Sequence, residues 1–459
     1  MSVPRSPERV LPTLNADGTR NRIRPRPYTG PLWSARRIVA VALMVLFIGL
    51  PFLKIDGKPA MLLDVLHRQF VLFGHTYLAT DGVLLMLLML SIFLSIVLTT
   101  ALVGRAWCGW ACPQTVYMEF LFRPLERLFE GPREAQLAID RRGGSSRRLA
   151  KNAVYLLLSF GLANVFLSYF VGVDTLGHWI VKAPSQNIGG FSVVLVTTGL
   201  VFFDFAYFRE QMCTVICPYA RLQSVLLDPK SLVIGYDLRR GEPRSKGKPK
   251  TTGHGDCIDC NACVTTCPTG IDIRQGLQLE CIACGQCADA CDSIMDRIKK
   301  PRGLIRYSSQ AALESGKPTS MLRPRVIIYA VALLALTTAL VLLGSARPKA
   351  EITILRGLGA PFTVTGSDVV NQLRLKVANR TEKTRQFSVA VAELPLAKIV
   401  APELPLSVKA SEQGVANFFV VVPSAELSGS RHVKLRVSDG ETVELVPYTL
   451  LGPEREAAR

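Results

Sequence analysis

Long apolar runs interrupt the chain at five places, and Arg or Lys residues flank them. A helix of about 20 apolar residues spans the roughly 30 Å hydrocarbon layer of a membrane. The pattern therefore predicts a five-helix transmembrane domain. A buried core helix is the alternative for any single run, but five basic-flanked runs favour membrane spans. The predicted spans cover about residues 38–53, 82–104, 152–173, 183–203 and 326–346.

The first of these runs is marginal by length alone. Only 16 residues separate Arg37 from Lys54, whereas a helix normally needs 17 or more to cross, by the usual estimate of roughly 17–25. The other four runs are long enough. Residues 1–37 form a basic N-terminal segment, and residues 38–238 form a membrane domain with four spans.

From about residue 350 the pattern changes to short alternating segments. Residues 372–377 and 432–437 alternate polar with apolar positions, and residues 418–422 form a short apolar run. About seven such strands in roughly 100 residues are typical of an immunoglobulin-like β-sandwich. We predict this fold for residues 350–452. The segment has no cysteine, so it would lack the inter-sheet disulfide, and no catalytic constellation is visible in it.

The distribution of charge indicates the orientation in the membrane. The chain carries a formal net charge of +18 although 49% of its residues are hydrophobic. Arg and Lys concentrate before the first span and between the second and third, and they are sparse in the other short connections. The positive-inside rule therefore predicts a cytoplasmic N-terminus, and five spans place the sandwich in the periplasm. Anionic membrane lipids are the expected partner of the basic segments; no RNA-binding platform or recognition helix indicates nucleic acid.

Eight of the twelve cysteines form two successive runs with the spacing of bacterial ferredoxins. In such proteins the fourth cysteine of each run binds the other cluster. We therefore predict two [4Fe-4S] clusters. Regular close spacing in a cytoplasmic segment disfavours disulfides, and zinc sites usually pair two well-separated units. The first predicted ligand set is Cys257, Cys260, Cys263 and Cys291, and the second is Cys267, Cys281, Cys284 and Cys287. Residues 239–325 would thus form a cytoplasmic region: a flexible tether to about residue 255, then a 2[4Fe-4S] ferredoxin-like domain.

The other four cysteines form a second repeated pattern. Cys108-x3-Cys112-Pro recurs 105 residues later as Cys213-x3-Cys217-Pro, and two further identities share this displacement. This indicates an internal duplication of a membrane hairpin. If the helices continued through the motifs, residues i and i+4 would share a face and four sulfurs would gather at the cytoplasmic membrane surface.

Several chemistries suit such a group of thiols. Soft thiolates prefer Cu(I), zinc or iron–sulfur clusters, and a reversible dithiol/disulfide pair is an alternative. Buried structural thiols are another alternative, but the occurrence of the motif twice in equivalent places favours a redox or metal role. Near the motifs, Arg105, Trp107 and Trp110 are predicted to form an interfacial aromatic belt with a snorkelling arginine. Asp204 is expected to mark the interface, with a functional role if it is buried.

Histidines in the predicted outer loops raise a separate question. A metal ion or quinol protons could engage them, although independent interfacial side chains are the commoner case. These residues are His67, His75 and His178.

Taken together, these motifs resemble a known family. Residues 104–113 read GRAWCGWACP and residues 213–218 read CTVICP, and the double ferredoxin run and terminal β-domain follow them. This combination resembles the cytochrome c oxidase accessory proteins of the CcoG/FixG/RdxA type over nearly the whole chain. The resemblance implies a bacterial inner-membrane protein that supports assembly of a cbb3-type oxidase. It also implies reduction of Cu(II) to Cu(I), with copper as substrate or bound ion and the four hairpin cysteines as the catalytic residues.

Electron transfer is the only part of this function that follows from the residues themselves. No nicotinamide or flavin fingerprint is present, so we expect a separate cytoplasmic electron donor. The other partners implied are oxidase assembly factors or copper chaperones and transporters, and a homodimer is left open. The alternatives are a quinol-linked respiratory subunit and a non-enzymatic scaffold whose clusters are structural.

Overall fold

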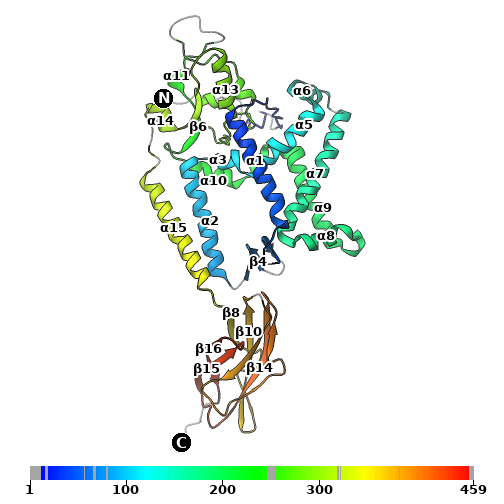
Figure 1. The fold of residues 1–459 in the computed structure, drawn as a ribbon, viewed down its shortest axis with the longest axis vertical. Coiled ribbons are helices and arrows are strands. Elements are labelled where there is room, and N and C mark those ends of the chain that lie inside the picture. Colours follow the sequence, from blue (N-terminus) through cyan, green and yellow to red (C-terminus); the bar gives the residue numbers. More distant parts are fainter. Residues whose placement is uncertain are drawn as a thin grey trace. The chain divides into compact units, whose positions relative to one another are not determined.

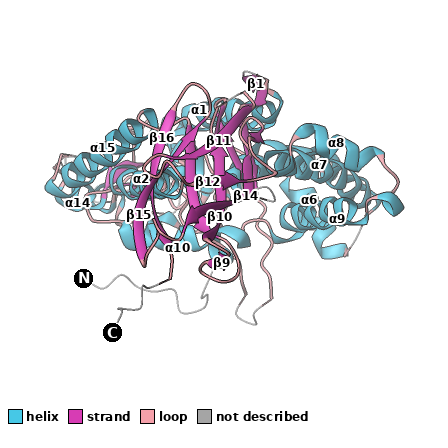
Figure 2. Cartoon of the chain, turned by 90° about the horizontal axis from the view of Figure 1, so that it is seen from below, coloured by secondary structure: helices cyan, strands magenta, loops and turns pink. Residues whose placement is uncertain are grey.

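The computed structural model describes residues 12–15, 19–55, 57–65, 69–78, 81–143, 145–245, 254–317, 320, 322–381 and 383–453. His67 and residues 246–253 of the predicted tether lie outside this described part. The chain divides into two compact units, Met1–Asp64 with Val83–Leu340, and Val65–Gly82 with Val341–Arg459. Helices make up most of the first unit, and the long strands belong to the second (Figure 2).

Five helices among the described residues are long and apolar enough to cross a membrane, which confirms the predicted five-helix architecture. Large apolar side chains on their outer surfaces are exposed, and lipid is the environment in which such surfaces are stable. The five are α1 (Pro31–Gly49), α2 (Gly82–Val103), α7 (Ser146–Val171), α9 (Ile188–Phe203) and α15 (Pro324–Ser345).

Helix α1 begins seven residues before the predicted span. Pro31 occupies the first helical position, where its missing N–H costs no hydrogen bond. The predicted span starts after Arg37 because charged residues normally mark the edge of a membrane helix. In the structure the preceding residue, Arg36, lies inside the helix and its side chain is fully buried in the protein.

Shorter elements connect the spans and build the ferredoxin region. The α-helices are α3 (Ala106–Trp110), α4 (Pro113–Tyr117), α5 (Arg123–Glu130), α6 (Arg133–Arg142), α8 (Val173–Val181), α10 (Pro218–Leu226), α11 (Leu238–Gly241), α12 (Ala262–Thr265), α13 (Gln286–Arg297) and α14 (Gln310–Ser315). The π-helices are η2 (Met118–Phe122), η4 (Asp204–Phe208) and η5 (Met212–Ile216), and the 3₁₀ helices are η1 (Leu50–Phe52), η3 (Pro184–Gln186) and η6 (Ile273–Gln275). The strands of this unit are β1 (Lys54–Ile55), β2 (Lys58–Pro59), β3 (Met61–Asp64), β6 (Leu232–Tyr236) and β7 (Ile305–Ser309).

The ferredoxin region packs against one end of the membrane helices (Figure 1). Asp289 of α13 accepts hydrogen bonds from the backbone amides of Leu32 and Trp33, at 3.2 and 2.7 Å. It therefore caps the first turn of α1, whose amides have no partner within the helix. At the end of α2, Gly104 lies so close to β6 that a Cβ there would be 2.3 Å from the Leu232 carbonyl oxygen.

The ferredoxin region begins earlier than predicted, because β6 pairs antiparallel with β7 from Leu232↔Ser309 to Tyr236↔Ile305. The predicted boundary at residue 239 follows β6. Part of the predicted tether is also folded: Arg240 beyond β6 forms an ion pair of 2.6 Å with Asp256.

The C-terminal part of the second unit is a β-sandwich, as predicted. One sheet has the order β12-β14-β10-β8, with β9 also paired to β10, and the other has the order β13-β11-β15-β16. In β10, buried and half-buried residues alternate, and Leu373 pairs with Phe418 of β14 in the core. The strands are β8 (Ala350–Arg356), β9 (Thr363–Thr365), β10 (Asp368–Asn379), β11 (Arg385–Val391), β12 (Lys398–Val400), β13 (Leu406–Val408), β14 (Gln413–Pro423), β15 (Ser430–Ser438) and β16 (Val443–Leu451).

The same unit includes a hairpin from the loop before α2, formed by β4 (Gln69–Leu72) and β5 (His75–Leu78). After it, Asp81 is buried between two arginines, Arg347 and Arg380. The carboxylate thus links the loop to the segment before β8 and to the end of β10 within this unit.

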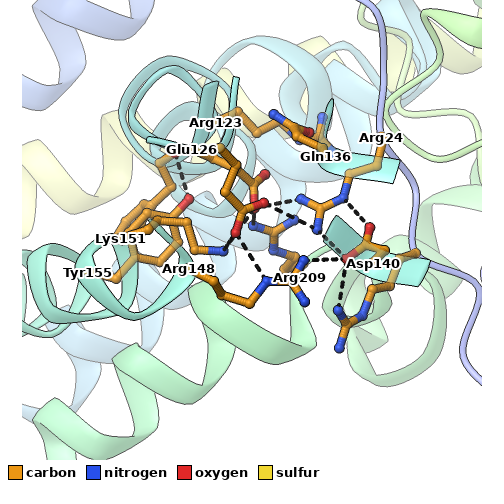
Figure 3. Close-up of polar contacts among 12 residues, drawn as sticks. Arg24, Arg123, Glu126, Gln136, Asp140, Arg148, Lys151, Tyr155 and Arg209 are labelled. Atoms are coloured by element: carbon orange, nitrogen blue, oxygen red, sulfur yellow. Dashed lines mark hydrogen bonds and ion pairs between the residues drawn. The ribbon is translucent and has the colours of Figure 1, made fainter. Parts of the chain in front are cut away.

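A buried ion network joins the N-terminal segment, α5, α6, α7 and the residue that follows η4 (Figure 3). At its centre the carboxylate of Glu126, 3% exposed, accepts from Arg209 at 2.5 Å and from Lys151 at 3.2 Å. Arg24 of the N-terminal segment lies 2.6 Å from the same oxygen. Burial alone would raise the pKa of Glu126, but the three cations outweigh burial and hold this pKa well below its usual range.

A second carboxylate, Asp140 of α6, extends this network. Arg24 donates to it at 3.0 Å and Arg148 at 2.5 Å. Burial opposes the effect of these arginines, which nevertheless lower the pKa of Asp140 to about 2. The N-terminal segment, α5, α6 and α7 are therefore held together by ionised groups.

Replacing Glu126 with Gln should destabilise the protein by about 3–5 kcal/mol, because three buried cations would lose their common anion. The control is Glu134→Gln on α6, where the carboxylate is exposed. Thermal unfolding of both variants in the same detergent measures the difference. Equal melting temperatures would contradict a stabilising role for the network.

Candidate iron–sulfur and thiolate sites

The first predicted ligand set lines one cavity. Its walls include Cys257, Cys260, Cys263 and Cys291, together with Arg274. The first two lie in the loop before α12, the third in α12, and Cys291 in α13. The thiol of Cys291 interacts electrostatically with the other three. Because Cys260 is exposed, this cavity lies near the protein surface.

The second predicted set lines a neighbouring cavity. Its walls include Cys267, Cys281, Cys284 and Cys287, with isoleucines such as Ile282 completing an apolar lining. Four soft donors around an apolar cavity are the donor set that a cubane cluster takes. The chain therefore brings together the cysteines that the exchanged pairing requires, and the residues fit the group.

Burial controls the ionisation of these thiols in the protein alone. It raises the pKa of Cys263, Cys281 and Cys291 to about 12 in each case. The thiols would thus keep their protons until a metal displaces them, which couples cluster insertion to proton release.

The two Cys-x3-Cys-Pro motifs have the same backbone structure. Cys112 and Cys217 are the N-cap residues of helices that begin with proline. Their amides donate to carbonyls five residues earlier, to Trp107 at 2.9 Å and to Met212 at 2.8 Å. All these positions are related by the displacement of 105, so the duplication inferred from a few identities is present in the backbone.

The same relation holds where each motif begins. Gly104 and Arg209 both adopt a positive φ, of 58° and 55°. However, the helices do not continue through the motifs, which a shared helix face for residues i and i+4 would require. Helix α3 ends at Trp110, and Ala111 leaves the helical region at φ −124°. The thiols therefore converge through a turn at each motif and not along one continuous helix face.

All four thiols of the motifs come together. Cys213 interacts electrostatically with Cys112, Cys108 and Cys217, in that order of strength. Burial raises the pKa of Cys213 to about 12 and that of Cys108 to about 11. The Cys108 thiol donates to the side-chain oxygen of Gln223 at 3.0 Å. Within the described residues, no three His, Cys, Asp or Glu side chains are grouped closely enough for a single metal ion; what the structure shows is four neighbouring thiols.

Asp204 adds a carboxylate to this group. It interacts electrostatically with Cys112 and Cys213 and accepts a hydrogen bond of 3.1 Å from Gln114. Its carboxylate therefore lies near the thiols, and its side chain is half-buried. Of the three histidines, His67 lies outside the described residues, while His75 lies in β5 and His178 in α8, in different units.

The first motif lies directly against the second ligand set. A Cβ on Gly109 would be 2.5 Å from the Ile282 carbonyl oxygen and 2.8 Å from the Cα of Cys284. Cys108, Ile282 and Cys284 form one packed cluster of buried side chains. Cys108 of the hairpin thiols is thus packed directly against the lining of the second cavity.

Two residues of this motif behave differently from the predicted aromatic belt. The Trp110 indole donates to the Tyr307 hydroxyl at 2.9 Å, and that hydroxyl donates to the Ala283 carbonyl at 2.6 Å. Arg105, predicted to snorkel, is only 4% exposed. Of the three predicted belt residues, Trp107 alone is exposed.

Comparison with known proteins agrees with this architecture. Family models match residues 208–310 (4Fe-4S dicluster domain), 85–132 (4Fe-4S binding domain) and 340–453 (IG-like fold at the C-terminal of FixG, putative oxidoreductase). Protein RdxA of Cereibacter sphaeroides is 34% identical over 432 residues, covering 88% of this chain and 90% of that protein. The chain belongs to the FixG/RdxA family.

Other relatives extend over similar lengths. Protein RdxB of the same organism is 33% identical, covering 85% of this chain and 87% of its own. Nitrogen fixation protein FixG of Rhizobium meliloti is 30% identical, covering 82% and 80%. This FixG-family member is therefore a membrane-associated iron–sulfur electron-transfer protein with an immunoglobulin-like C-terminal domain.

Sequence reasoning missed several residues that build the site of this FixG-family protein. Gln223, Tyr307 and Asp289 contact the thiols, the loop of the second ligand set and helix α1, respectively. Gln223 and Tyr307 lie outside the cysteine motifs, and Asp289 occupies a variable position of the second cysteine run. Each acts across a sequence distance of more than 20 residues, which only the folded chain reveals.

Substituting Gly109 with Ala should disturb the second ligand set selectively, because the new methyl group would push against the backbone of Cys284. Iron analysis and EPR spectra of the reduced protein, purified without oxygen, should show the first cluster retained and the second lost or altered. Gly161→Ala in α7 is the control, since a Cβ there meets no atom within 4 Å. Indistinguishable spectra for the two variants would contradict the contact.

Proposed function

We propose that this FixG-family protein reduces Cu(II) to Cu(I) for assembly of a cbb3-type cytochrome c oxidase. The observation that carries the proposal is the packing of Cys108 against Cys284, which joins a four-thiol group to the second predicted cluster site. The two [4Fe-4S] clusters, when bound, supply one-electron transfer. The copper and the oxidase are what the family resemblance implies.

The hairpin residues would bind the copper ion. Thiolates prefer Cu(I), so Cys108, Cys112, Cys213 and Cys217 would stabilise the reduced ion more than the oxidised one. The reaction adds one electron to copper and requires no proton. Copper nevertheless displaces protons from the thiols when it binds, and Asp204 is a neighbouring group that could accept one.

The electron would come from a separate cytoplasmic donor. Cys260 is the exposed ligand of the first set, so a donor would approach there. The product would pass to a copper chaperone, a copper transporter or an oxidase assembly factor. Membrane lipids surround the spans, and a homodimer is compatible with this arrangement.

We place the protein in the bacterial inner membrane with its N-terminus in the cytoplasm and the β-sandwich in the periplasm. The basic residues before α1 and between α2 and α7 support this orientation. The ferredoxin region caps the N-terminus of α1 through Asp289, so it would lie on the same, cytoplasmic side.

Changing both Cys112 and Cys217 to Ser should abolish copper binding and Cu(II) reduction while both iron–sulfur signals remain. A colorimetric Cu(I) assay and copper analysis of anaerobically purified protein measure these two properties. Cys260→Ser serves as the comparison, because it should bind copper normally and lose reduction. Wild-type reduction in the double variant would exclude the hairpin thiols, and undiminished reduction in Cys260→Ser would favour a scaffold with structural clusters.

Reporter fusions should reveal the orientation. A reporter enzyme that is active only in the periplasm should be active when fused after Gly452 and silent when fused after Ser245. Five spans precede Gly452, whereas four precede Ser245, so only the first fusion would lie on the side opposite the N-terminus. Immunoblots of both fusions control for expression. The reverse pattern would invert the topology and remove the cytoplasmic donor from the proposal.

A further inference from the structure

Two buried arginines near the second ligand set each have guanidinium nitrogens without a hydrogen-bond acceptor among the described residues. Arg36 of α1 is 0% exposed; its Nε donates to the Gly109 carbonyl at 2.8 Å, but neither Nη1 nor Nη2 has a hydrogen-bond partner among the described residues. Arg105 is 4% exposed, and its Nε and Nη1 have none in the same part of the chain. An unpaired charge of this kind is costly to bury.

Both guanidinium groups act on cysteines of the second set. Arg36 interacts electrostatically with Cys284, and Arg105 with Cys281 and also with Cys108. Geometry places both beside this set: Arg36 bonds to Gly109, which packs against Cys284, and Arg105 lines a cavity together with Cys281. Four thiolates give a bound cubane cluster a net negative charge, so the missing acceptor for both arginines would be present when the cluster is bound.

The first ligand set has a different electrostatic environment. Its nearby arginine, Arg274, forms ion pairs of 2.5 Å with Asp259 and 2.7 Å with Asp272. The positive charge beside the first set is thus neutralised by carboxylates, whereas no salt bridge to a described carboxylate neutralises Arg36 or Arg105. Hydrogen bonds and positive charge near a cluster stabilise its reduced form and raise its reduction potential.

We propose that Arg36 and Arg105 donate hydrogen bonds to the second cluster and its thiolates and thereby hold its reduction potential above that of the first cluster. The electron then resides preferentially at the cluster next to Cys108. This inference concerns the order of the two potentials and holds whether or not copper is the substrate.

An EPR-monitored redox titration of anaerobically purified protein tests the proposal. In the wild type, the signal lost in Cys284→Ser should titrate at a higher potential than the signal lost in Cys260→Ser. Arg36→Gln should lower the potential of the second cluster and leave the first unchanged. Arg37→Gln is a matched control, because it removes the same charge from the adjacent, exposed position of the same helix.

Two further variants separate an electrostatic role from a purely structural one. Arg36→Lys retains the charge and should restore part of the lost potential, whereas a residue needed only for packing against Gly109 would gain nothing from charge. Arg105→Gln should lower the reduction potential of the second cluster as well.

Titrations in which Arg36→Gln and Arg105→Gln leave the potential of the second cluster unchanged, or in which Arg37→Gln lowers it equally, would overturn the proposal. If Arg36→Gln fails to hold the cluster, the potential measured for Arg36→Lys and Arg105→Gln decides.

Discussion

The close approach of Gly109 to the backbone of Cys284 is the contact on which the arrangement of the redox groups depends. No side chain larger than hydrogen fits between the two backbones, so the first hairpin motif and the loop of the second ligand set are in direct contact. The contacts around it follow from this approach: Trp110 reaches Tyr307, and Arg36 reaches the Gly109 carbonyl. A ferredoxin region on a flexible tether could not keep thiols and cluster ligands in side-chain contact; this one is docked.

Buried charge serves two distinct purposes in this unit. Around Glu126 the cations Arg24, Lys151 and Arg209 are balanced by carboxylates, and the network joins elements that are distant in sequence. Around the second ligand set, two guanidinium nitrogens each of Arg36 and Arg105 have no hydrogen-bond partner among the described residues. Around Glu126, ion pairs offset the cost of burying charge and stabilise the fold. Around the second ligand set, the same cost points to a negatively charged group that the protein binds there.

The sequence predicted those features that depend on local chemistry. Three cysteines with two residues between neighbours can place their thiols around one cluster, so the ligand sets could be inferred from spacing. The length of the apolar runs was sufficient to find the spans. Features that depend on long-range packing could not be inferred. Arg36 looks like the charged edge of a span, and only its burial against Gly109 shows that α1 continues past it. Arg105 looks like a snorkelling residue because nothing in the local sequence indicates that it lies against the ferredoxin region.

The two hairpin motifs both adjoin the ferredoxin region, but they differ at the positions where the first motif meets the second ligand set. Each repeat supplies two thiols through the same turn, but the residues between them differ. At the position of Gly109 the second repeat has Thr214, whose hydroxyl bonds to the Glu210 carbonyl. At the position of Arg105 it has Glu210, a buried carboxylate that lies 3.6 Å from both Arg20 and Arg123. Duplication accounts for the number of thiols. The two differences account for the closer approach of the first motif, because it has a glycine and an arginine next to the second ligand set where the second motif has Thr214 and Glu210.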